Sequence, residues 1–141
     1  MWPGGEWCCG IDTGERMFKD VRVLIKGAGD LATGVAARLW RSGFPVVRTE
    51  RVQPLTIRRT VAFAEAVYEG EVKIEEITAC RVSGVADIEP AWQMEVIPVL
   101  VGCDEECVAA VKPEVLVDAT LAKRNIGTLI TDAPFVVGLG P

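Results

Sequence analysis

The residues best suited to chemistry form a glycine-rich turn with the sequence KGAGDLATG. An apolar run over residues 21–26 leads into this turn, and a helical pattern follows it. Glycines at this place let the backbone bend tightly and approach a ligand, while the next helix directs its unpaired N–H groups at the same point. The pattern therefore predicts a phosphate site, whose candidate binding residues are Lys26, Gly27, Ala28, Gly29, Asp30 and Gly34.

Glu50 stands at the predicted end of the second strand, residues 45–49, where a dinucleotide-binding domain carries an acid for a ribose hydroxyl. A carboxylate here favours NAD over NADP, although Arg48 and Arg51 flank it and could offset the repulsion of a 2′-phosphate. The alternative is that the glycines serve only the steric needs of a turn and that Glu50 is a surface acid.

A second polar cluster, DATLAKRN, follows the predicted strand 115–118. Because ligands of open α/β sheets bind at the carboxyl ends of strands, this cluster is expected to face the same crevice. Arg124 and Asn125 could hold a phosphate or carboxylate, and a solvated loop would look the same. Asp118 and Lys123 are the candidate catalytic groups, with Asp118 the better acid–base group.

Arg58 and Arg59 occupy the first turn of a predicted helix over 56–69. Positive charge there opposes the helix dipole, which indicates either a neighbouring anion or two solvated side chains.

The composition narrows the chemistry further. The 141 residues include no histidine, so neither a Ser-His-Asp unit nor a histidine-ligated metal is available within this chain. Five cysteines with poor zinc spacing argue against a metal site and a disulfide framework. The net charge of -5 and the lack of a basic stripe argue against nucleic acid. Neither a long apolar segment nor a signal peptide is present, so we expect a cytoplasmic protein without a membrane partner.

Alternating strand and helix patterns predict an α/β, Rossmann-like three-layer fold with a mostly parallel sheet and a two-stranded excursion around 71–82. Asp30 is the predicted N-cap of the helix after the turn, and Gly43 closes that helix. Residues 1–20 are expected to form a poorly ordered N-terminal extension, and residues 21–141 a nucleotide- or cofactor-binding domain. Further strands are predicted at 96–101 and 133–137, a helix at 104–112, and a short helix or turn at 86–95.

Four segments together resemble the selenium-dependent molybdenum hydroxylase system protein (YqeB) family: KGAGDLATG, QP with IRR and VAFAEAVYEG, LVDA with LAKRN, and GLGP. That family is similar to the Rossmann part of the xanthine dehydrogenase accessory (XdhC/CoxI) proteins. The resemblance implies an accessory role in a molybdenum hydroxylase system and a ligand, NAD(P) or the molybdenum cofactor, at the Gly27–Gly34 turn. A molybdenum hydroxylase is the partner that this role implies.

Members of that family continue beyond Gly140-Pro141, so the chain is expected to be the N-terminal part of a longer protein. A truncated sheet would leave strand edges exposed, which favours a homo-oligomer. Two other hypotheses stay open: an NAD-dependent oxidoreductase, which would rely on Lys26, Asp118 or Lys123, and a non-catalytic partner-binding fragment with purely structural glycines.

Overall fold

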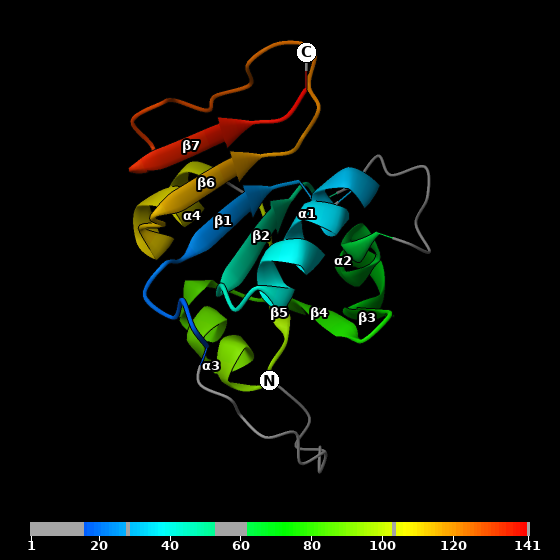
Figure 1. Cartoon of the computed structure of the whole chain (residues 1–141). Helices are drawn as coiled ribbons and strands as arrows, with labels where there is room; N and C mark the ends of the chain where they lie inside the picture. Colours follow the sequence, from blue (N-terminus) through cyan, green and yellow to red (C-terminus); the bar gives the residue numbers. More distant parts are fainter. Residues whose placement is uncertain (1–15, 28, 53–61, 103, 141) are drawn as a thin grey trace.

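A computed structural model describes residues 16–27, 29–52, 62–102 and 104–140. Its centre is a seven-stranded sheet with the order β3-β4-β5-β2-β1-β6-β7 (Figure 1). All neighbouring pairs are parallel except the β3–β4 hairpin. The strands are β1 (Val23–Lys26), β2 (Val46–Glu50), β3 (Glu71–Ile74), β4 (Ile77–Val82), β5 (Ile97–Val101), β6 (Val115–Asp118) and β7 (Phe135–Gly138).

Helices cover both faces of this sheet. They are α1 (Asp30–Arg41), α2 (Ala66–Glu69), α3 (Ile88–Gln93) and α4 (Asp104–Val111). Side chains alternate between the two faces of a strand, so β1 contributes Ile25 to the core under α1 and α2, and Leu24 to the core under α3 and α4. The predicted three-layer α/β fold is confirmed, and the two-stranded excursion predicted around 71–82 is the β3–β4 hairpin, which is antiparallel.

The central strands β1 and β2 are buried on both faces, as the apolar runs of a parallel sheet predict. Trp92 ties α3 to this centre, because its indole Nε1–H donates to the Val46 carbonyl at 2.8 Å. The exception within β2 is Arg48, a charged side chain with 0% exposure. This arginine proves to belong to the candidate site.

The predicted N-cap is wrong by one residue. Gly29 is the N-cap of α1, and Asp30 is its first helical residue, with no side-chain capping bond. Asp30 still contributes a carboxylate to the first turn, where negative charge is favourable to the helix dipole. Gly43 follows the helix in a left-handed conformation, φ +92°, as predicted.

The predicted helix over 56–69 is shorter than its pattern. Residues 56–61 lie outside the described residues, and Ala62 is extended, with φ −123° and ψ 134°. A 3₁₀ turn at Phe63–Glu65 and the single α-turn of α2 follow, ending at Gly70 with φ +83°. The helix is therefore not continuous, and Tyr68 of its predicted buried stripe is half exposed.

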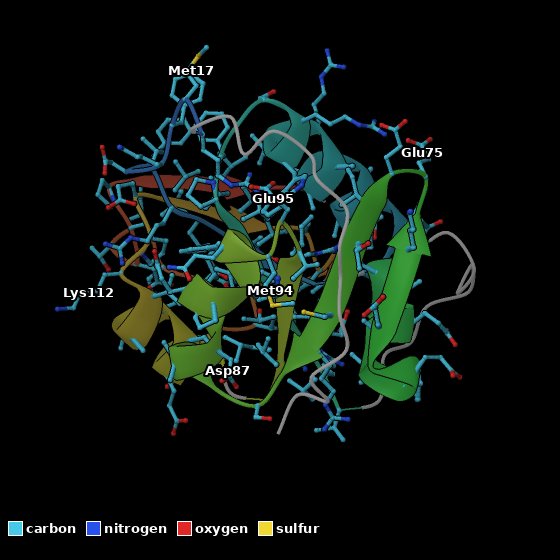
Figure 2. The ribbon with its side chains drawn as sticks, turned by 90° about the horizontal axis from the view of Figure 1, so that it is seen from below. Met17, Glu75, Asp87, Met94, Glu95 and Lys112 are labelled. Carbon is cyan, nitrogen blue, oxygen red and sulfur yellow. The ribbon has the colours of Figure 1, made fainter. Side chains whose placement is uncertain are left out.

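Residues 16–18, which precede β1, contact side chains in and after α1 and α3. Arg16 pairs with Glu95, Nη2 to Oε2 at 2.7 Å, and its guanidinium lies 3.5 Å from the ring centre of Trp40. Phe18 stacks on Phe44 with ring centres 4.4 Å apart. Figure 2 views the molecule from below and labels Met17 and Glu95. No helix in the described ranges is long and apolar enough to cross a membrane.

Candidate functional site

The strand order reverses at β1, which lies between β2 and β6. Ligands of open parallel sheets bind in the crevice at such a switch point, outside the carboxyl ends of the strands. Lys26 ends β1 and lies in register with Thr49 of β2 on one side and Asp118 of β6 on the other. The topology thus brings the glycine turn, Glu50 and Asp118 to one edge of the sheet.

Gly27 is required by its surroundings. Its φ is +98°, and a Cβ there would lie 3.1 Å from the Ala119 carbonyl oxygen. Its N–H donates to the Thr49 carbonyl at 2.8 Å, so this amide extends the sheet rather than facing the crevice. Gly27 therefore lets the turn lie directly against the end of β6.

The other two glycines of the motif lie in open space. Gly29 has an ordinary φ of −66°, and a Cβ at Gly29 or Gly34 would meet nothing within 4 Å. Gly34 is exposed, while Ala32 is the small residue buried against the sheet. Gly29 stands at the start of α1, and because it has no side chain it leaves room there for a ligand.

Lys26 and Asp118 are joined through a threonine that no sequence motif indicated. Lys26 Nζ donates to Thr128 Oγ1 at 3.1 Å, and Thr128 Oγ1 donates to Asp118 Oδ2 at 2.7 Å. Asp132 Oδ2 lies 4.0 Å from Lys26 Nζ. Since Lys26 is only 5% exposed, this network neutralises an ammonium group that lies almost entirely inside the protein.

Asp118 is held as a carboxylate. Partial burial alone would raise its pKa, but hydrogen bonds from Thr120 and Thr128 and the charge of Lys26 together bring the pKa below its usual value. Thr120 donates both its N–H, at 3.1 Å, and its hydroxyl, at 2.6 Å, to Oδ1. An ionised, tightly bonded carboxylate is better suited to fixing the crevice than to releasing a proton near neutral pH.

The segment between β6 and β7 arches beyond the ends of these strands (Figure 1). Asn125 organises its turn: Oδ1 accepts from the N–H groups of Gly127 and Thr128, and Nδ2 donates to the Thr128 carbonyl. Thr128 is thereby positioned for Lys26 and Asp118. Lys123 and Arg124 are exposed. Asn125 and Thr128 thus build the network, and the two cations lie at its solvent side.

Arg48 is the site residue whose role the sequence pattern missed. The side chain does not reach solvent beside Glu50; instead Nη2 donates to the Gly27 carbonyl at 2.7 Å and Nη1 to Thr33 Oγ1 at 3.1 Å. It is therefore not available to a 2′-phosphate beside Glu50. The available signal was an arginine within the strand VVRTE, directly between Val47 and Thr49, two residues that are suited to burial in a strand.

Three candidate binding residues, Ala28, Arg58 and Arg59, lie outside the described residues. Glu50 is partly buried at the end of β2, and its Oε1 accepts the N–H of Arg51 at 2.8 Å. Asp30 is exposed at the start of α1.

An open groove of about 900 Å³ lies beside this network on the α4 face. Lys26 contributes to its lining together with Val108 of α4, Lys112 just after α4, and Leu129 and Asp132 between β6 and β7. Lys26 thus links the groove to the crevice at the glycine turn.

Among the described residues, no group of three or more metal-ligating side chains gathers. Cys80 and Cys107 are buried, and Cys103 lies outside the described residues. Burial, with Glu71 and Asp87 nearby, raises the pKa of the Cys80 thiol to about 11. Cys80 is therefore a core side chain and a poor nucleophile.

Comparison with known proteins identifies a bacterial relative. The chain is 44% identical over 119 residues to the uncharacterized protein YqeB of Escherichia coli (strain K12). The match covers 84% of this chain and 22% of that protein. Neither a protein-family model nor a solved structure matches the chain. The chain is therefore a homologue of YqeB, and it corresponds to about a fifth of that protein's length.

Proposed function

We propose that the chain is a cytoplasmic accessory protein of a selenium-dependent molybdenum hydroxylase system. It binds a phosphate-bearing ligand, either a dinucleotide or the molybdenum cofactor, at the turn from Gly27 to Gly34. The observation that carries this proposal is the position of the turn at the switch point between β1 and β6, with Lys26 and Asp118 in register beside it. The resemblance to the YqeB family supplies the molybdenum part of the proposal.

The geometry supports a phosphate rather than a neutral ligand. Gly29 leaves open space at the start of α1, a helix of 12 residues with its positive dipole end at the crevice. Lys26, at the end of β1, lies in the groove on the α4 face, where Asp118 and Asp132 balance its charge, so the support comes from the start of α1. Both candidate ligands carry phosphate, so this geometry is shared by the two.

A thermal-shift experiment separates the candidates. NAD, NADP and the molybdenum cofactor are each titrated against the purified chain, with sodium chloride at matched ionic strength as the control. A ligand at a hundred times its Kd stabilises the fold by about 2.7 kcal/mol, which raises the melting temperature by several degrees. Stabilisation by NAD without stabilisation by the cofactor contradicts the molybdenum role, and no shift with any of the three contradicts a ligand site at this turn.

Gly29→Ala is the variant that tests the turn itself. An alanine Cβ is accommodated because φ is −66° and nothing lies within 4 Å, so the unliganded melting temperature stays within about one degree of wild type. The added methyl group occupies the space that a phosphate would approach, and ligand affinity falls about tenfold. Unchanged affinity in this variant would show that the ligand binds elsewhere.

An NAD(P)-dependent oxidoreductase is the second candidate, and Glu50 at the end of β2 favours it. The chain lacks histidine, so Lys26, Asp118 or Lys123 would have to move the proton. A fall in NADH absorbance with a carbonyl substrate would support this activity. If the chain binds NAD but shows no such fall across substrate classes, the accessory role is the one that is favoured.

We also propose a homo-oligomer and a molybdenum hydroxylase partner. The sheet ends in β3 on one side and β7 on the other, and Phe135 of β7 is 62% exposed. Light scattering after size exclusion measures the mass of the particle, and a monomer at all concentrations contradicts self-association through these edges.

A further inference from the structure

Arg48 is a buried charge without an opposite charge bonded to it. The side chain is 0% exposed in the centre of the sheet, between β1 and β5. Its Nη atoms donate to two neutral oxygens, those of Gly27 and Thr33, and its Nε has no hydrogen-bond partner. Within the described ranges it forms no ion pair.

An arrangement of this kind is costly for the unliganded fold. A buried cation is normally paired, because neutral acceptors replace only part of the hydration that it loses. Burial lowers the pKa of Arg48 to about 9, and the charge of Glu50 opposes this shift. Arg48 is therefore still protonated at neutral pH, and the ring of Phe63, 5.2 Å from its guanidinium carbon, adds a weak attraction.

The guanidinium lies under the beginning of α1. Gly27 precedes the helix and Thr33 belongs to its first turns, so the two bonds of Arg48 connect the turn to the helix. Thr33 Oγ1 also accepts the Phe63 N–H at 3.0 Å. The positive end of the helix dipole and the arginine charge therefore act on the same small region.

We infer that Arg48 is the buried counter-charge for the diphosphate of a ligand held at the start of α1. Arg48 does not touch the ligand; it is a positioning residue that fixes the Gly27 carbonyl and Thr33 and supplies a fixed positive charge beneath the turn. The inference rests on the proposed function and adds to it the ligand class, a diphosphate ester with at least two negative charges.

Sodium pyrophosphate is the probe, titrated in thermal-shift experiments at constant ionic strength against wild type, Arg48→Met and Arg48→Lys. The Met variant loses roughly thirtyfold in affinity, because the fixed charge beneath the turn and the two hydrogen bonds that position Gly27 and Thr33 are both removed. Unliganded Arg48→Met melts at the same temperature as wild type or higher, because the unpaired charge is gone. The Lys variant keeps the charge without the guanidinium fork and loses only about threefold to tenfold.

Arg38→Met is the matched control, since Arg38 is exposed near the other end of the same helix. It is expected to bind pyrophosphate within about twofold of wild type. If Arg48→Met does not fold, Arg48→Gln replaces it, because glutamine keeps an N–H donor for Gly27 without the charge. Wild-type affinity in either variant overturns the inference while the ligand site stands. If pyrophosphate, NAD, NADP and the molybdenum cofactor all fail to stabilise wild type, the proposed function fails together with the inference.

Discussion

Gly27→Ala is expected to destabilise the chain by about 2 kcal/mol or more, with wild-type ligand binding lost as a consequence. Two costs add. A φ of +98° is strained for any residue with a Cβ, at about 1–3 kcal/mol. The Cβ would also lie 3.1 Å from the Ala119 carbonyl oxygen, a backbone atom that moves only with the end of β6.

Gly34→Ala is the matched control, and its sign is opposite. Gly34 lies within α1, its position is exposed, and a Cβ there meets nothing within 4 Å. Alanine stabilises a helix interior by about 1 kcal/mol relative to glycine. Urea unfolding of both variants gives the two free energies. A neutral Gly27→Ala would contradict the described contact between the turn and β6.

The strands were predictable because a parallel sheet buries both faces of its central strands. The apolar runs VLI and LV are typical of buried strands, and the glycine and polar residues that follow them mark the carboxyl ends. Lys26 and Asp118 could therefore be assigned to one crevice from the sequence alone. Their exact partners could not, because Thr128 and Asp132 lie in a segment without helical or strand period.

Arg48 and Ala62 show what pattern reasoning cannot supply. The alternation of side chains along β2 predicts that Arg48 shares a face with Val46. The guanidinium is buried because α1 and Phe63 pack over this face, which the alternation alone does not predict. The apolar spacing around Ala62 fits a helix, while the bond from Phe63 N–H to Thr33 fixes the chain just after Ala62 onto α1. In both cases tertiary contacts outweigh a local preference.

Asp118→Asn is expected to cost about 1–2 kcal/mol of unfolding free energy at neutral pH. The carboxylate accepts hydrogen bonds from Thr120 and Thr128, and the amide nitrogen of asparagine cannot replace one of those acceptors. The substitution also removes one of the two carboxylates near Lys26, the other being that of Asp132. Leaving a buried hydrogen-bonding group without its partner costs about 1–3 kcal/mol, and the lower part of that range is expected here because Asp118 is only partly buried.

The cost depends on pH in a definite direction. The pKa of Asp118 is lower in the folded chain than in the unfolded chain, so the ionised form stabilises the fold. That contribution is complete above the ordinary aspartate pKa of about 3.9 and disappears as the pH falls through the lower folded-state pKa. The difference in unfolding free energy between wild type and Asp118→Asn should therefore shrink as the pH is lowered from about 5. Urea titrations at successive pH values measure it, with the exposed Asp20→Asn as the matched control.

A double-mutant cycle decides whether Lys26 and Asp118 act as a unit. Lys26→Met alone leaves the Asp118 carboxylate with its threonine donors but without the nearby cation. Asp118→Asn alone leaves a 5% exposed ammonium group with the Asp132 carboxylate at 4.0 Å but without that of Asp118. The double variant removes both charges, so its cost should be smaller than the sum of the single costs by about 0.5–3 kcal/mol. Strictly additive costs would mean that Thr128 does not couple the two residues. Lys26 and Asp118 would then not act as a charge pair in the crevice between β1 and β6.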